Sequence, residues 1–144
     1  MITDALNKVS SAQALTTTAV STDKIDLQTA RDIGEGENLF MLFSVDTQLA
    51  GGTSVTFEAV VADDAALSTN VTVVGSSGAI LTAALVAGYT TAVRLNPMIS
   101  SLGRRYFGAR YTISGTYTSG NASAQVVHDI QDGKKFYASG FTVV

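Results

Sequence analysis

The sequence contains no cysteine and no tryptophan, and it has only one histidine and one proline. The absence of cysteine excludes thiolate catalysis, iron–sulfur ligation and a disulfide framework. With one histidine and no cysteine, the chain lacks the further His or Cys ligands that a zinc site needs. It also cannot form a cysteine–histidine catalytic pair. Charged residues make up 15% of the chain, well below the usual quarter. We therefore expect no metal site and no cofactor.

The acidic pairs of the chain do not form a recognisable catalytic or calcium-binding pattern. They lack the spaced Asp-x-Asp-x-Asp arrangement of a calcium loop. Two carboxylates could in principle hydrolyse a glycosidic bond, but sugar-binding clefts usually offer tryptophan. Gly75–Gly78 lacks the Gly-Lys-Ser/Thr ending of a phosphate-binding loop. The sequence predicts no catalytic residues, and we expect that the protein is not an enzyme.

The net charge of −3 argues against nucleic acid as a partner, because phosphate binding needs clustered lysine and arginine. No membrane association is expected either, since the longest nearly apolar run, residues 79–88, is too short to span a bilayer. The N-terminus lacks a basic segment followed by an apolar core, so no secretory signal is predicted. We expect synthesis in a cytoplasm.

Short segments of alternating apolar and polar residues dominate the chain. Val55–Ala62 alternates most regularly, and a long β-hairpin is predicted over Gly103–Ile130 with its turn at Thr118–Asn121. About eight strands separated by turn residues indicate an all-β fold. We predict a two-sheet antiparallel β-sandwich with jelly-roll or related Greek-key connections. Single helical turns are expected near residues 4–9 and 63–68, and one or two near residues 82–88.

The predicted hairpin should contribute one face to the core. Apolar residues recur at Phe107, Ala109, Tyr111 and Ile113, with small or polar residues between them. His128 continues the apolar register of the second strand. We therefore expect a half-buried, hydrogen-bonded histidine.

Residues 1–27 are predicted to be an extended N-terminal arm, and residues 28–144 the β-sandwich domain. The arm has few large apolar residues, so we expect it to lie on a surface and to be ordered by a neighbouring chain. Arginine next to aromatic residues is typical of interface anchors, although these arginines could equally lie solvated at the start of a strand. The interface candidates are Thr16, Thr18, Val20, Ile25, Leu27, Arg104, Arg105, Asp132, Lys134 and Lys135.

Four segments together resemble a known family. They read MITDALNKVSSAQALTTTAVSTDKIDL, ARDIGEGENLFMLFSVDT, LGRRYFGARYTISGT and VVHDIQDGKKFYASGF. The chain resembles the Bbp16-type capsid cement (decoration) proteins of short-tailed phages, with residues 62–96 the least distinctive. The resemblance implies a jelly-roll-like homotrimer on the outer surface of an icosahedral virion head. There it would bridge major capsid proteins around local three-fold positions.

Two other functions stay open at this point. One is a carbohydrate- or receptor-binding β module on a virion or cell surface, which glycan or cell binding would reveal. The other is a head–tail or tail component, which would occupy one vertex in low copy number.

Overall fold

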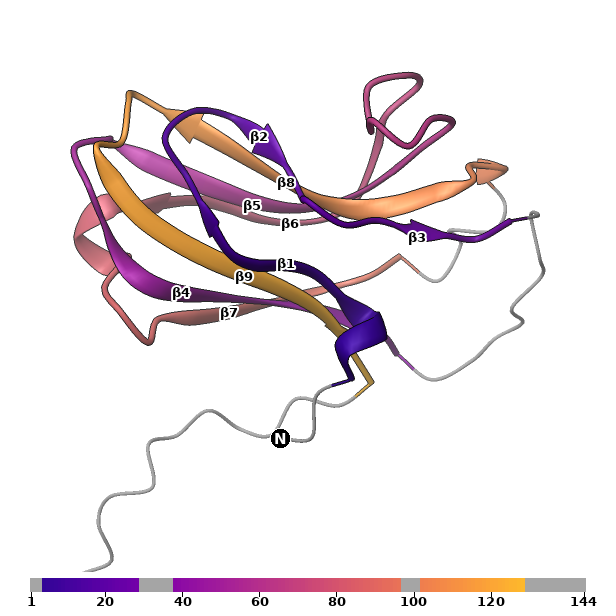
Figure 1. The fold of residues 1–144 in the computed structure, drawn as a ribbon, viewed down its shortest axis with the longest axis horizontal. Coiled ribbons are helices and arrows are strands. Elements are labelled where there is room, and N and C mark those ends of the chain that lie inside the picture. The colour runs from indigo at the N-terminus through magenta and orange to yellow at the C-terminus, as the bar shows by residue number, and fades with distance from the viewer. Residues whose placement is uncertain (1–3, 29–37, 97–101, 129–144) are drawn as a thin grey trace, which may run out of the picture.

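The computed structural model describes residues 4–28, 38–96 and 102–128, and these residues form two antiparallel sheets packed face to face (Figure 1). The first sheet consists, in spatial order, of β1 (Lys8–Ala14), β9 (Ser119–Val127), β4 (Phe40–Ala50) and β7 (Thr90–Arg94). The second consists of β2 (Ala19–Val20) with β3 (Ile25–Asp26), then β8 (Tyr106–Ser114), β5 (Ser54–Ala62) and β6 (Thr72–Leu81). Two single 3₁₀ turns, η1 (Ala5–Asn7) and η2 (Thr82–Ala84), complete the described elements.

The strand order confirms the predicted jelly roll. The chain crosses between the sheets repeatedly, so that β9 lies between β1 and β4, and β8 lies between β2 and β5. A four-stranded and a five-stranded sheet connected in this way form the double Greek key of a jelly roll. Both β2 and β3 pair with β8, and they act as two halves of one edge strand.

The core between the sheets is centred on three aromatic rings. Phe43 of β4 lies 5.1 Å from Phe57 of β5 and 6.0 Å from Tyr111 of β8, measured between ring centroids. The pairs with Tyr111 are edge-to-face, a favourable arrangement worth about 0.5–1.5 kcal/mol per pair beyond burial. Burial raises the pKa of Tyr111 to about 12. The predicted inward face of β8 is confirmed, because Phe107 and Ala109 are also buried.

A second, smaller apolar cluster lies on the outer face of the second sheet. Val60 and Ala62 of β5 are covered there by Leu67, which comes from the loop 63–71. Gly108 makes this contact possible, because a Cβ at that position would lie 2.7 Å from Leu67 Cδ1. The β5–β6 loop is thus anchored on the sheet by an apolar side chain.

The N-terminal segment is part of both sheets, and the expectation that it lacks anchoring in its own domain is wrong. β1 pairs with β9, and β2 and β3 pair with β8. Val9 and Leu15 are essentially inaccessible to solvent. The Ser21 hydroxyl is also buried and accepts a hydrogen bond from the Ala109 backbone amide. Two well-placed apolar residues and sheet pairing fix the segment, although it has little other core material.

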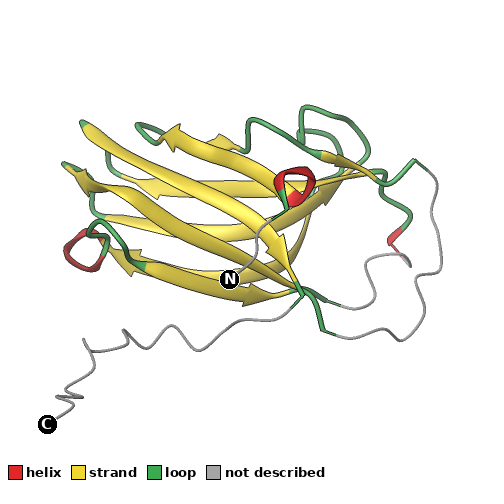
Figure 2. Cartoon of the chain, turned by 60° about the horizontal axis from the view of Figure 1, so that its bottom comes forward, coloured by secondary structure: helices red, strands yellow, loops and turns green. Residues whose placement is uncertain are grey.

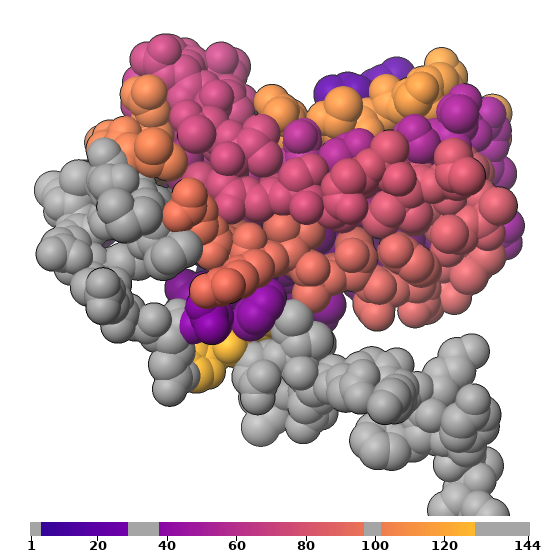
Figure 3. Space-filling view, turned by 180° about the vertical axis from the view of Figure 1, so that it is seen from behind, coloured from indigo at the N-terminus to yellow at the C-terminus, as the bar shows by residue number. Residues whose placement is uncertain are grey.

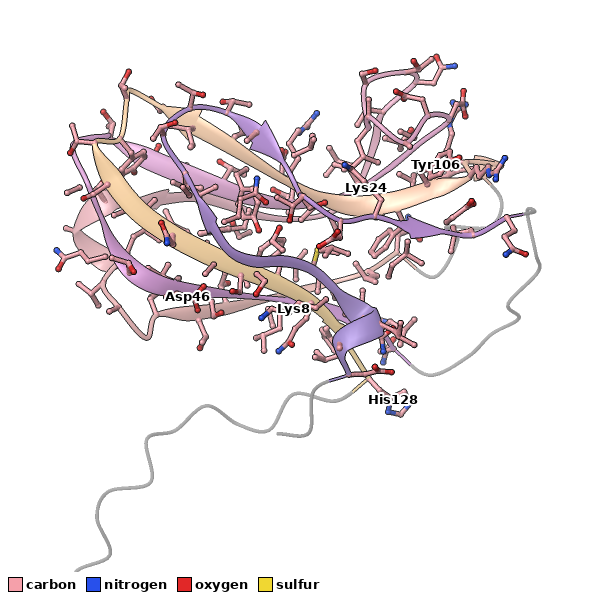
Figure 4. All side chains as sticks on the ribbon, in the orientation of Figure 1. Lys8, Lys24, Asp46, Tyr106 and His128 are labelled. Carbon is pink, nitrogen blue, oxygen red and sulfur yellow. The ribbon has the colours of Figure 1, made fainter. Side chains whose placement is uncertain are left out.

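Three local predictions need correction. The turn between β8 and β9 lies at residues 115–118, earlier than predicted, because Gly120 is accommodated within β9 at a φ of +130°. Residues 63–68 form a hydrogen-bonded loop instead of a helical turn, because the Asp64 carboxylate accepts from the Ser68 and Thr69 amides. His128 is exposed at the end of β9 (Figure 4), since Val127 takes the buried position before it.

Candidate interaction surface

Two of the predicted interface arginines bind carboxylates of their own chain. Arg104 Nη1 lies 2.8 Å from Asp63 Oδ1, and this pair fastens the loop 63–71 to the start of β8. Arg105 forms a two-pronged pair with Asp26, with its Nε and Nη2 donating at 2.9 and 2.8 Å. Its guanidinium also lies 5.2 Å from the centre of the Tyr106 ring. We call this end of the sandwich, with Asp26, Asp63, Asp64, Arg104 and Arg105, the ion-paired end.

The carboxylates at the ion-paired end are stabilised in their charged form. The hydrogen bond from Arg105, with the Gln28 amide, lowers the pKa of Asp26 to about 2. Hydrogen bonds from the Thr69 amide and the Ser68 hydroxyl lower the pKa of Asp64 to about 2. The pKa of Asp63 is also lowered, by Asn70 and then by Arg104. The two arginine pairs join segments that are distant in the sequence, whereas the hydrogen bonds to Asp64 lie within the loop 63–71.

A third ion pair lies on the outer face of the second sheet. Arg110 of β8 donates from Nε to Glu58 of β5 at 2.8 Å, and the Thr112 hydroxyl donates to the same oxygen at 2.7 Å. The Glu58 side chain is only 13% exposed. Burial raises its pKa, but the hydrogen bonds from Arg110 and Thr112 outweigh this and hold the pKa below its usual value.

The predicted interface residues of the N-terminal segment divide into two groups. Thr16 and Thr18 are exposed. Val20, Ile25 and Leu27 are partly buried and pack against the two apolar clusters of their own domain. Asp132, Lys134 and Lys135 lie outside the described residues, so their predicted interface role is not addressed by the structure.

The opposite end of the sandwich is formed by turns without a single charged residue. Figures 1 and 2 show these turns together, at the left of Figure 1 and far from β3 and the loop 63–71. None contains Asp, Glu, Lys, Arg or His. We call this surface the neutral end, and it comprises residues 15–18, 51–53, 81–90 and 115–118.

The turns of the neutral end are tied to one another by hydrogen bonds. The Thr82 hydroxyl donates to the Gly52 carbonyl at 2.7 Å, so the Tyr117 hydroxyl, 2.6 Å away, must donate to Thr82. The Tyr117 backbone amide donates in turn to the Thr16 carbonyl at 3.0 Å. Tyr117 as a whole residue is 1% exposed. The neutral end is therefore a preorganised surface.

A family model named Bbp16 matches residues 9–126, which is most of the chain. The chain belongs to the Bbp16 family. This membership confirms the resemblance found in the sequence, and it identifies a phage structural protein associated with the virion. No curated protein matches the chain.

The region matched by the Bbp16 model includes all four turns of the neutral end. The longest of them, residues 81–90, carries Leu81 at 65% and Val86 at 46% exposure, with Ala83, Ala84 and Ala87 also exposed. Figure 3 shows the side of the molecule formed by β6 and β7, with this turn at its right-hand end.

The interface candidates selected from the sequence include two residues, Thr16 and Thr18, within the neutral end, and they miss the apolar turn 81–90. The sequence of this Bbp16 family member nevertheless contains a feature that could have indicated the turn 81–90. No charged residue occurs between Asp64 and Arg94. Three further uncharged runs each contain another turn of the same end, namely residues 9–22, 47–57 and 111–127. Only the topology shows that the four runs reverse direction at one place.

Residues 4–28, 38–96 and 102–128 contain no group of three or more His, Cys, Asp or Glu side chains that could hold a metal ion. Within the same ranges, no helix has the length and apolar character to cross a membrane.

Proposed function

We propose that this protein is a capsid cement (decoration) protein, which binds the outside of an icosahedral phage head as a homotrimer and bridges major capsid proteins. The observation that carries the proposal is the Bbp16 family match over residues 9–126. The role is structural and requires no cofactor or catalytic residue. Its partners are other copies of the chain and the major capsid protein.

The distribution of charge supports a role in protein contacts. Covering a charged group with protein costs desolvation energy unless the group finds a partner. Here Arg104, Arg105 and Arg110 already have intramolecular carboxylate partners. Much of the remaining described surface consists of hydroxyl-bearing and small apolar residues, which are inexpensive to cover.

A trimer on the head would stabilise it through two physical effects. Each trimer presents the same contact surface three times, so the first contact makes the next ones effectively intramolecular and weak contacts add up to durable attachment. Binding only the mature, expanded shell then stabilises that state over competing ones by linkage. The protein would act as a clamp against the pressure of the packaged DNA.

Reconstitution tests the proposal. Purified protein is mixed with heads that lack it, the heads are sedimented, and the bound copies are counted by quantitative mass spectrometry. We expect saturable binding of many copies distributed over the head surface. Failure to bind, or binding of a few copies at one vertex, would overturn the cement role, and the second result would indicate a head–tail component.

A further inference from the structure

Two exposed large apolar residues, Leu81 and Val86, lie close together on one turn of the neutral end. Leu81 and Val86 flank η2, and the residues between them are Thr82, the two exposed alanines and the buried Leu85. The Leu85 carbonyl accepts a hydrogen bond from the Leu49 amide at 3.1 Å, which holds the turn against β4. Turns at the surface of a soluble domain are usually polar. A fixed, apolar turn surrounded by hydroxyl-bearing residues is typical of a protein–protein contact surface.

The surface around this turn is built to remain in place when it is covered. Gly52 lies directly under Tyr117, and a Cβ on it would be 2.3 Å from the ring. The hydrogen bonds from Tyr117 to Thr82 and from Thr82 to Gly52 leave these buried polar groups satisfied inside the chain. Little conformational freedom is therefore left to lose on association, which favours binding.

The absence of charge indicates which occupant this surface suits. When identical chains meet through equivalent surfaces, charges on those surfaces face like charges unless they are arranged in complementary pairs. The chain carries a net charge of −3, so two copies repel each other weakly overall. Contact through the neutral end keeps the charged residues of the ion-paired end far from the junction.

We propose that the neutral end is the surface through which copies of this chain contact one another, with Leu81 and Val86 as its apolar anchors. The inference rests on the proposed function in that it assigns the homotrimer contact to one end of the sandwich. The ion-paired end and the sheet faces are then left for the major capsid protein.

The first test is the oligomeric state of the full-length chain, measured by size-exclusion chromatography with light scattering over a range of concentrations. We expect the wild-type chain to self-associate. Leu81→Asp and Val86→Lys should each raise the dissociation constant by at least about tenfold, because a charge would be buried without a partner. Both residues are exposed in the single chain, so circular dichroism and the melting temperature of dilute samples should show intact folds.

A matched control places the same charge elsewhere. Leu6 is 86% exposed and lies in η1, outside the neutral end. Leu6→Asp should leave the dissociation constant unchanged. Association through an uncharged apolar surface should also persist in high salt, whereas an interface of ion pairs would dissociate. A monomeric wild type, a Leu81→Asp variant that associates normally, or dissociation by salt would each overturn the proposal.

Head binding separates this inference from the proposed function. If wild-type chains self-associate through the neutral end but do not bind heads, the cement role fails and the self-contact stands. If wild-type chains bind heads in many copies but as monomers, the head-binding part of the proposed function stands, whereas its homotrimer and the self-contact both fail. If Leu81→Asp associates normally but no longer binds heads, the neutral end contacts the capsid and the self-contact is overturned.

Discussion

The two ends of this sandwich use different chemistry. At the ion-paired end, Arg104 and Arg105 join the start of β8 to Asp63 of the loop 63–71 and to Asp26 of β3. At the neutral end, hydroxyl groups and buried aromatic and aliphatic side chains hold the turns, with Thr82 and Tyr117 at their centre. The strand β6 runs between the two, from the polar loop 63–71 to the apolar turn 81–90.

The difference shows how a charge-poor protein can distribute its few charges. Ion pairs at exposed sites contribute little stability, but they select which segments lie next to each other. Concentrating them at one end leaves the other end free of groups that resist desolvation. Substitutions at both ends and on the sheet face test this division.

The N-terminal segment should be essential to the neutral end even though it contributes few apolar residues. Leu15 is fully buried, so Leu15→Ala should destabilise the fold by about 3 kcal/mol through lost burial and a residual cavity. Leu81→Ala, the same substitution at an exposed site, should cost the single chain less than about 0.5 kcal/mol. Urea unfolding at low concentration measures both. Equal effects would show that the segment is not part of the core.

The close contact between Gly52 and Tyr117 should be intolerant of a methyl group. Gly52→Ala would place a Cβ 2.3 Å from the buried ring, and we expect a loss of about 2 kcal/mol. Gly78→Ala is the control, because a Cβ there meets nothing within 4 Å and only its φ of +71° is unfavourable, at a cost of about 1 kcal/mol. Thermal unfolding distinguishes them. A smaller loss for Gly52→Ala than for Gly78→Ala would contradict the tight packing of the neutral end.

The ion pair on the sheet face should matter more than the exposed pairs, because Glu58 is largely covered. Arg110→Leu should cost about 2 kcal/mol at neutral pH by leaving the Glu58 carboxylate with Thr112 alone. The pKa of Glu58 in the folded state is lowered from its ordinary value of 4.5. The stabilisation that the Glu58 carboxylate provides is therefore present above pH 4.5 and is lost as the pH falls through the folded-state pKa. The difference between the two proteins should shrink in acid. A difference that persists at low pH would point to lost packing instead.

The ion-paired end should give the fold its sensitivity to acid. The pKa of Asp26 is lowered from 3.8 to about 2, so its stabilisation is complete above about pH 4 and is lost as the pH falls toward 2. Arg105→Gln removes the main cause of this shift and should flatten the decline in melting temperature over that range. The Leu6→Gln variant, also at an exposed site, should leave the decline unchanged. An identical pH profile for Arg105→Gln would show that the pair has no thermodynamic effect.

Much of the fold could be predicted from the sequence because alternation reports directly on burial. Phe107, Ala109 and Tyr111 face the core, as their spacing requires, and β5 occupies the predicted residues. The turn chemistry was less informative. Gly120 and Asn121 indicate a turn by composition, yet they lie in β9 because Leu49 packs closely against Gly120.

The candidate surface was harder to predict, because it depends on segments that are distant in the sequence. Nothing local indicates that Arg105 will meet Asp26, which lies 79 positions earlier. Likewise, the uncharged turns are unremarkable one by one, and they form a surface only because the jelly roll brings residues 15–18 and 81–90 to the same end. Single residues such as Leu15 also outweigh the average composition of their segment.

The proposed role of this Bbp16 family member is to hold the phage head together. The most direct measurement is the temperature at which heads release their DNA, followed by a DNA-binding dye, for heads with the protein, without it, and after it is added back. We predict earlier release from heads that lack the protein, and full recovery on addition of the wild-type chain. The same release temperature in all three samples would contradict the account.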